Sequence, residues 1–219
     1  MQEPSEKSKS CLQLVTSTSC IASFHVFAFN CGRSILRVAY NDPSFSYSHR
    51  CSVSDSVLTL ALPTPEDTDR LGARLSEAFG RNAELLREKG FALRLEGNLG
   101  AGKTSLVRAM LRAAGFAGPV KSPTFSLVET YPVWGVTLAH FDFYRFEDPI
   151  EFEDAGFRDD FAPGTLAVTE WSEKALPYLP DADAVIELEH DGLGRRARLR
   201  ALTPAGRQIF EALACDAAN

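Results

Sequence analysis

The stretch Phe91-Ala-Leu-Arg-Leu-Glu-Gly-Asn-Leu-Gly-Ala-Gly-Lys-Thr104 decides the fold, because it joins a strand pattern to a phosphate-binding motif. The positions that match the pattern G-x-x-x-x-G-K-[ST] are Gly97, Gly102, Lys103 and Thr104. Large apolar side chains alternate with shorter or charged ones before the motif, which predicts a strand. Apolar residues recur at helical spacing after it, as far as Gly115, which predicts a helix. Strand, glycine loop and helix in this order favour a P-loop over a glycine-rich turn.

The loop has the chemistry that a nucleoside triphosphate needs. Without a Cβ, its glycines let the backbone approach phosphate oxygens, and N–H groups at the helix N-terminus form an anion nest. Lys103, expected to be solvated without a ligand, would reach the β- and γ-phosphates, and the Thr104 hydroxyl would ligate Mg²⁺. We expect the loop residues in contact with the nucleoside triphosphate to be Gly97, Asn98, Leu99, Gly100, Ala101, Gly102, Lys103, Thr104 and Ser105.

The composition limits the partners. The chain has 219 residues, of which 45% are hydrophobic and 24% charged, which is ordinary for one soluble globular domain with an appendage. A net charge of −6 argues against a broad basic surface, so neither DNA nor a membrane is an expected partner. Any contact with RNA must be local or made by a partner. A single cysteine after residue 52, Cys215, is typical of a reduced cytoplasmic protein.

Residues 1–52 differ from the rest, being rich in serine and cysteine and lacking a long helical periodicity. The cysteine separations match no zinc site, and the apolar run at 20–29 is too short to span a membrane and is followed by no cleavage site. We expect a poorly ordered extension, or sequence translated from a start codon upstream of the true one. The P-loop ATPase domain is expected to occupy residues 53–219.

The remaining elements predict an α/β fold. Before the P-loop, a strand at 57–62 leads to a helix with Thr64 as N-cap and Pro65 as first residue, which extends or restarts before Gly90. The elements expected after the P-loop helix are a strand at 127–131, a turn at 132–135, a strand at 136–141, a short capped helix at 148–156, a strand at 165–169, a hairpin at 184–201 and a final helix capped by Thr203. We predict a single domain with a P-loop NTPase-like mixed β-sheet flanked by helices.

Two carboxylates are candidates to complete a metal site. Asp142 and Glu170 each follow an apolar strand, which favours a place at the sheet edge where a P-loop protein holds its metal, over a surface carboxylate or helix cap. Thr124 lies between the loop helix and Asp142 in a segment stiffened by Pro123, and is either a switch threonine that reaches Mg²⁺ or the γ-phosphate, or a turn hydroxyl.

Two further patterns favour structural interpretations. The sequence Asp191-Gly-Leu-Gly194 fits the D-x-x-G of guanine-nucleotide switches, but no N-K-x-D follows, and a hairpin turn explains it better. The alternating arginines at 196, 198 and 200 resemble a nucleic-acid stripe. Cross-strand ion pairs with Glu187 and Glu189 are the favoured alternative.

Taken together, these motifs resemble the TsaE (YjeE) family, small bacterial ATPases of tRNA threonylcarbamoyladenosine synthesis. The resemblance covers about Leu58 to Ala214 and rests on Gly97-Asn-Leu-Gly-Ala-Gly-Lys-Thr104, Val120-Lys-Ser-Pro-Thr-Phe125, Leu127-Val-Glu129, His140-Phe-Asp-Phe-Tyr-Arg145 and Glu170-Trp171. Asn98 stands where the family frequently has an acid, and Phe125 where tyrosine is common.

The resemblance implies specific roles. Thr104 and Glu170 would hold Mg²⁺ with Asp142 as a Walker-B-like carboxylate, while the segments Thr64-Pro65 and Gly194-Arg195 would border the nucleotide. It also implies TsaD and TsaB as partners. TsaD transfers the threonylcarbamoyl group to tRNA, and the ATP cycle of TsaE keeps the complex turning over, so tRNA would be contacted indirectly.

Without a recognisable arginine finger, we expect Lys103, Asp142, Glu170 and Thr124 to support a weak Mg²⁺-dependent ATPase that partner proteins stimulate. A small-molecule or nucleoside kinase, and a regulatory subunit that binds ATP without hydrolysing it, are the alternatives.

Overall fold

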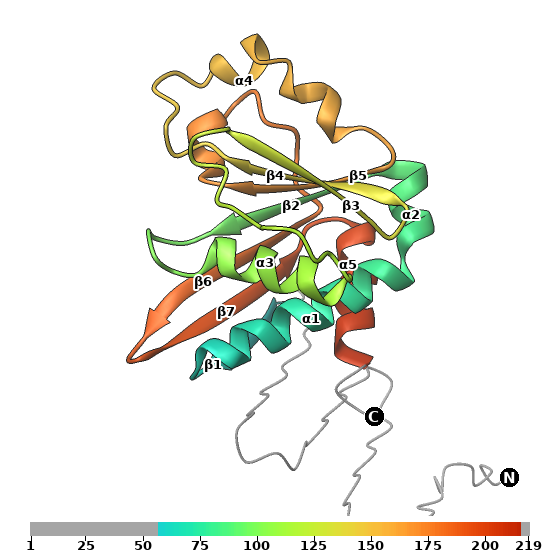
Figure 1. Ribbon diagram of the computed structural model, residues 1–219, viewed down its shortest axis with the longest axis vertical. Coiled ribbons are helices and arrows are strands. Elements are labelled where there is room, and N and C mark those ends of the chain that lie inside the picture. The colour runs from blue at the N-terminus through green and yellow to red at the C-terminus, as the bar shows by residue number, and fades with distance from the viewer. Residues whose placement is uncertain (1–56, 216–219) are drawn as a thin grey trace, which may run out of the picture.

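The computed structural model describes residues 57–215, with side chains up to residue 213. The predicted extension at 1–52 and the domain boundary at 53 lie outside the described residues. Within them, one seven-stranded sheet has the strand order β1-β7-β6-β2-β5-β4-β3, and helices pack against it (Figure 1). The predicted mixed sheet flanked by helices is confirmed.

The strand that precedes the P-loop lies at the centre of the sheet. The strands are β1 Val57–Leu62, β2 Phe91–Glu96, β3 Val128–Val133, β4 Val136–Asp142, β5 Thr165–Glu170, β6 Ala184–Asp191 and β7 Gly194–Ala201. β2 pairs in parallel with β5 and β6, and β4 pairs in parallel with β5. The outer pairs β1–β7, β6–β7 and β3–β4 are antiparallel. The carboxyl ends of β2, β4 and β5 therefore meet at one edge of the sheet.

The helices begin and end where local chemistry dictates. They are α1 Pro65–Arg81, α2 Ala83–Lys89, α3 Lys103–Ala113, α4 Glu151–Asp154 and α5 Pro204–Cys215, with 3₁₀ turns η1 Phe157–Phe161 and η2 Ser172–Ala175. At the start of α1 the Asp67 carboxylate accepts the N–H of Thr64 at 2.8 Å. At the start of α5 the Thr203 hydroxyl accepts the N–H of Gly206 at 3.2 Å. Both predicted N-caps are confirmed.

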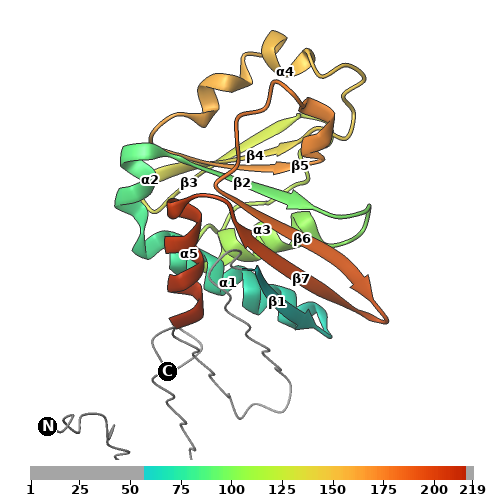
Figure 2. The ribbon, with the colours of Figure 1, turned by 180° about the vertical axis from the view of Figure 1, so that it is seen from behind.

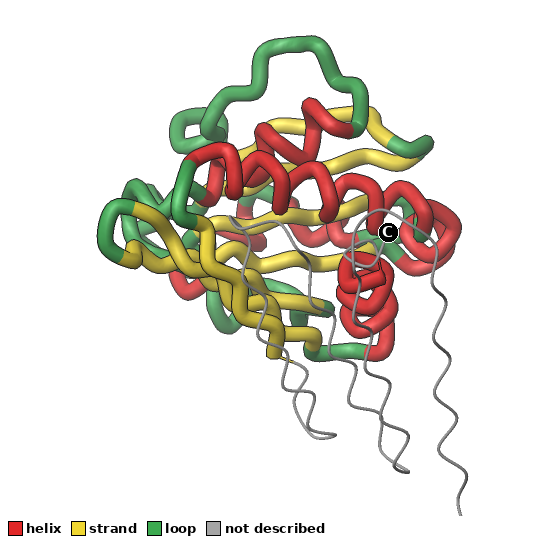
Figure 3. The backbone as a smooth tube through the Cα atoms, turned by 90° about the horizontal axis from the view of Figure 1, so that it is seen from below, coloured by secondary structure: helices red, strands yellow, loops and turns green. Residues whose placement is uncertain are grey.

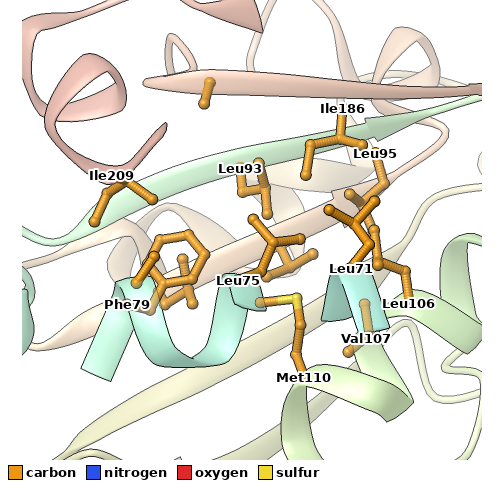
Figure 4. Packing of buried hydrophobic residues seen from close by; sticks show 14 of the residues in the cluster. Leu71, Leu75, Phe79, Leu93, Leu95, Leu106, Val107, Met110, Ile186 and Ile209 are labelled. Carbon is orange, nitrogen blue, oxygen red and sulfur yellow. The ribbon is translucent and has the colours of Figure 1, made fainter. Parts of the chain in front are cut away.

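The main core lies between the sheet and helices α1, α3 and α5. Leucines of β2 and α1, a methionine and a valine of α3, and Ile209 of α5 converge there (Figure 4). α1 crosses α3 closely, because a Cβ on Gly72 would lie 2.4 Å from the Cβ of Ala109. Seen from behind, β6 and β7 lie in front and α1 and α3 lie beyond the sheet (Figure 2). From below, the strands run side by side across the molecule with helices against them (Figure 3).

A second, aromatic cluster fixes the other face of β4 and β5. Phe141 on β4 packs edge-to-face on Phe157, with ring centres 5.3 Å apart, and stacks on Phe161 at 5.5 Å. Phe143 and Phe152 extend the cluster. The segment that carries α4 and η1 arches over this end of the sheet (Figure 1). β4 is thus packed on both faces, which holds the residues at its carboxyl end in place.

The structure differs from the predicted elements in one hairpin and in the 3₁₀ turns. Pro132, predicted in a turn, lies within β3, which tolerates a proline because it is the edge strand. Leu127, predicted to start that strand, has a φ of 64° and precedes it. The short turns η1 and η2 have too few residues for a periodic pattern to predict them.

Candidate functional site

The P-loop is shaped by the contact of its first glycine with a neighbouring strand. Gly97 has a φ of 135°, and a Cβ there would lie 2.2 Å from the carbonyl oxygen of Leu188 on β6. Gly102, with a φ of 104°, precedes the first residue of α3. Both positions favour glycine, because a side chain would be strained at that φ, and at Gly97 it would also strike the backbone of β6. The loop between them turns the chain from β2 into the N-terminus of α3, the geometry of an anion-binding nest.

Lys103 is buried against the loop, which corrects the expectation of a solvated side chain. The residue is 5% exposed, and its ammonium donates to the carbonyl oxygens of Gly97 at 2.5 Å and Asn98 at 3.2 Å. Its Nζ lies 4.4 Å from the centre of the Trp171 ring. Burial lowers the pKa of Lys103, while the charge of Glu170 and, more weakly, that of Asp142 oppose the shift. The ammonium is therefore hydrogen-bonded to carbonyl oxygens of the loop itself.

Thr104 and Glu170, predicted together as metal ligands, are in direct contact. The Thr104 hydroxyl, on the first turn of α3, donates to Glu170 Oε1 at 2.9 Å. Glu170 ends β5 and is buried. The same oxygen lies 2.9 Å from Nε2 of His140, a buried residue of β4. A hydroxyl and a carboxylate at one point are the hard oxygen donors that Mg²⁺ prefers.

Asp142 lies beside Glu170 in the β4–β5 register, but its carboxylate is already hydrogen-bonded. Oδ2 accepts the Thr124 hydroxyl at 2.5 Å, and Oδ1 accepts the N–H of Tyr144 at 3.0 Å. The segment around Thr124 is thus tied to the carboxyl end of β4. Asp142 and Thr124 therefore form a second polar contact at the same edge of the sheet.

The two segments expected to border a nucleotide pack together at the side of the loop. Arg195 lies against Gly102, where a Cβ on the glycine would be 3.0 Å from the Arg195 Nε. That Nε is buried and has no hydrogen-bond partner among the described residues. Gly194 abuts the backbone of Leu62 and Pro63, the residues that lead into Thr64 and Pro65. The hairpin turn, the start of α1 and the P-loop are therefore neighbours.

No group of three or more His, Cys, Asp or Glu side chains within residues 57–213 is arranged to hold a metal ion on its own. The donor set of Thr104 and Glu170 fits such an ion.

The rim of the site carries exposed aromatic and apolar side chains. Phe125 is 84% exposed, and the Arg145 guanidinium lies 4.1 Å from the centre of its ring. Leu99 of the P-loop is also exposed. The Tyr144 and Trp171 rings lie 5.1 Å apart, and Trp171 has a φ of 57°. Of these side chains, the half-buried Trp171 also contacts the ammonium of Lys103.

The β6–β7 hairpin contains both motifs that favoured structural interpretations. Asp191 and Gly194 pair across a tight turn between β6 and β7, which confirms the hairpin interpretation. Arg198 lies 3.4 Å from Glu187 and 3.5 Å from Glu189, so the predicted cross-strand pairs form. Arg196 pairs with Asp191 instead. His140 stands in the motif at 140–145 that resembles the TsaE family, but the sequence assigned it no role, and its contact with Glu170 is visible only in the structure.

None of the helices within residues 57–215 is both long enough and apolar enough to span a bilayer.

Comparisons with known proteins identify the family that the chain resembles. A family model described as "Threonylcarbamoyl adenosine biosynthesis protein TsaE" matches residues 62–198. The chain is 40% identical over 155 residues to the tRNA threonylcarbamoyladenosine biosynthesis protein TsaE of Haemophilus influenzae, covering 71% of this chain and 96% of that protein. It is 34% identical over 128 residues to the protein of the same name from Bacillus subtilis, covering 58% and 75%.

A solved structure is similar in fold. The crystal structure of Bacillus subtilis YdiB superposes with a TM-score of 0.57 at 24% identity, covering 75% of this chain and 99% of that one.

Proposed function

The chain belongs to the TsaE family of threonylcarbamoyl adenosine biosynthesis proteins, and from this premise we propose that it is the ATP-binding and ATP-hydrolysing subunit of that machinery. Family membership gives it a role in the biosynthesis of tRNA threonylcarbamoyladenosine. The use of ATP and Mg²⁺, the partners and the cytoplasmic location are the further content of the proposal.

The observation that carries the proposal is the contact between Thr104 and Glu170. Sixty-six positions separate the two residues, yet the hydroxyl and the carboxylate are 2.9 Å apart at the N-terminus of α3. A kinked glycine loop, a buried lysine and a hydroxyl–carboxylate pair at one sheet edge are the set that triphosphate binding with a hard divalent cation requires. Thr104 and Glu170 would hold the Mg²⁺, which neutralises phosphate charge when bound.

Lys103 would bind the phosphates by exchanging its partners. Its ammonium is held by two carbonyl oxygens of the loop, which are weaker partners than phosphate oxygens because they carry no net charge. A bound triphosphate would attract the ammonium away from them. The loop residues 97–105 would supply backbone N–H donors to the same phosphates.

Asp142 and Thr124 would respond to the nucleotide together. Their 2.5 Å hydrogen bond ties the segment that precedes β3 to the sheet edge, beside Glu170. Thr124 would turn from Asp142 toward the phosphate or the metal when both are bound, as switch threonines do. Arg195, whose Nε has no partner among the described residues, would border the nucleotide from the β6–β7 turn.

The described arginines near the site are both engaged elsewhere, so neither is assigned to the negative charge that develops on the transferred phosphate in the transition state. Arg195 packs against the loop backbone, and Arg145 stacks on the exposed ring of Phe125. We therefore propose slow hydrolysis by the chain alone and completion of the site by the TsaD–TsaB pair. The support for these two partners is the resemblance to TsaE.

The experiment adds the chain to purified TsaD–TsaB with tRNA, threonylcarbamoyl-AMP and ATP, and counts modified adenosines per TsaD. We expect multiple turnovers with the wild-type chain and about one or fewer with Lys103→Ala. Equal counts with wild type, variant and no addition would contradict the proposed function.

A further inference from the structure

One buried titratable side chain lies beside Glu170. His140, on β4, is 0% exposed. Its Nε2 lies 2.9 Å from Oε1 of Glu170, the oxygen that also accepts the Thr104 hydroxyl. Its other ring nitrogen, Nδ1, is buried and has no hydrogen-bond partner among the described residues.

The register of the sheet explains why these side chains meet. β4 and β5 run in parallel, with His140 beside Val168 and Asp142 beside Glu170. Residues two apart on a strand project from the same face, so His140 and Glu170 both face the side of the sheet that α3 covers. Thr104 approaches from the first turn of α3. One carboxylate oxygen thus joins two strands and the P-loop helix.

The hydrogen bond has a fixed direction. An ionised carboxylate only accepts, so the N–H of Nε2 is the donor to Oε1 of Glu170. Glu129 on β3 lies opposite His140 in the β3–β4 pair, and its carboxylate accepts the Ser126 hydroxyl at 2.9 Å. The Glu170 contact is therefore the hydrogen bond that orients the imidazole.

Packing alone does not call for a histidine at this position. The neighbouring inward positions Leu138 and Val168 belong to the apolar core. An imidazole there loses its hydration and regains one hydrogen bond, whereas an apolar side chain would lose nothing. The imidazole of His140 instead restrains Glu170, because a carboxylate held at one oxygen by two donors cannot rotate freely.

We propose that His140 is a positioning residue: it holds the Glu170 carboxylate in the orientation in which that group binds a divalent cation beside Thr104. The inference rests on the proposed function, since Glu170 is a cation ligand only there. His140 itself, fully buried, would touch neither the nucleotide nor the metal.

A matched pair of variants tests the proposal. His140→Gln keeps an N–H donor at about the same distance from the backbone as Nε2. His140→Met has about the length and shape of the glutamine variant but no N–H donor. The readouts are the affinity for Mn²⁺, measured by electron paramagnetic resonance with ADP present, and the affinity for ADP in EDTA. Melting temperatures report on the fold.

We expect His140→Met to weaken Mn²⁺ binding by about 10–100-fold, as substitutions of groups that orient metal ligands do. His140→Gln should stay within about threefold of wild type, and ADP affinity in EDTA should be unchanged in both. In hydrolysis assays kcat should fall in His140→Met with little change in KM for ATP. Equal Mn²⁺ affinity in all three folded proteins would overturn the proposal.

A second measurement leaves His140 and Glu170 unchanged, so it tests the proposal even if both His140 variants fail to fold. His25, His49 and His190 are replaced by Gln, so that His140 gives the only imidazole signals in a ¹H–¹⁵N spectrum. We expect a proton on Nε2, and a shift when Mg²⁺ joins the ADP complex that exceeds the shift caused by ADP. A proton on Nδ1 alone, or no response to Mg²⁺, would overturn the inference. Failure of the wild-type chain to bind ADP with Mn²⁺ would instead reject the proposed function.

Discussion

Substitution of Gly97 by alanine should distort the P-loop through one contact. The new Cβ would lie 2.2 Å from the carbonyl oxygen of Leu188, a backbone atom of β6 that cannot move without disturbing the sheet. Gly100→Ala is the matched control in the same loop, because Gly100 also has a positive φ, 79°, but nothing lies within 4 Å of its Cβ position. The two variants share backbone strain and differ in the collision.

The expected magnitudes follow from these two terms. Backbone strain at a non-glycine residue with positive φ costs about 1–3 kcal/mol, and both variants incur it. Forcing a methyl group into a packed contact costs about another 1–3 kcal/mol, which only Gly97→Ala incurs. Gly97→Ala should therefore lose about 2–6 kcal/mol of unfolding free energy, against about 1–3 kcal/mol for Gly100→Ala.

The assay is equilibrium unfolding in urea, with ATP affinity measured by calorimetry on each folded variant. Gly97→Ala should have the lower urea midpoint and the weaker ATP affinity, since the loop must move away from β6. Equal midpoints for the two variants would refute the reasoning that contact with Leu188 shapes the loop.

Four further substitutions, with Arg196→Met as a control, probe the roles proposed for the site. Lys103→Ala should weaken ATP binding by at least about tenfold, or 1.4 kcal/mol, because it removes the ammonium that would meet the phosphates; an unchanged calorimetric affinity would reject the P-loop assignment. Glu170→Ala and Asp142→Ala should each reduce Mg²⁺-dependent phosphate release more than metal-free ATP binding, and normal release by both would place the metal elsewhere. Arg195→Met should weaken ATP binding by about tenfold, because Arg195 would border the nucleotide. The control Arg196→Met removes only the exposed ion pair with Asp191 and should leave ATP affinity unchanged. Equal effects of the two variants on ATP affinity would show that Arg195 is not part of the nucleotide site.

Much of the fold could be predicted because its signals are local. The alternation in 91–95, the glycines of the loop and the N-caps Thr64 and Thr203 each act within a few residues. Pro132 was placed wrongly in a turn, because its tolerance depends on β3 being the edge strand. Edge position is a property of the whole sheet, which residues near Pro132 do not encode.

The site was predictable only to the level of its motifs. Strand-end placement indicated Asp142 and Glu170, but not that Glu170 contacts Thr104 while Asp142 contacts Thr124. Burial of Lys103 was missed because a lysine in a loop usually lies in solvent, and its partners here are carbonyl oxygens exposed by the loop's own curvature. No role could be assigned to His140, although it opens the motif at 140–145, because its partner Glu170 lies 30 residues away on a neighbouring strand.

Phosphate release at saturating ATP and Mg²⁺, from the chain alone and with the TsaD–TsaB pair, tests the central claim most directly. Lys103, Thr104 and Glu170 account for nucleotide and metal, and a residue supplied by a partner can raise the rate of a P-loop enzyme by about 10³–10⁵-fold. We predict slow release from the chain alone and a rise of at least about tenfold with the pair, which corresponds to about 1.4 kcal/mol of barrier. Fast release by the chain alone, with no response to the pair, would contradict it.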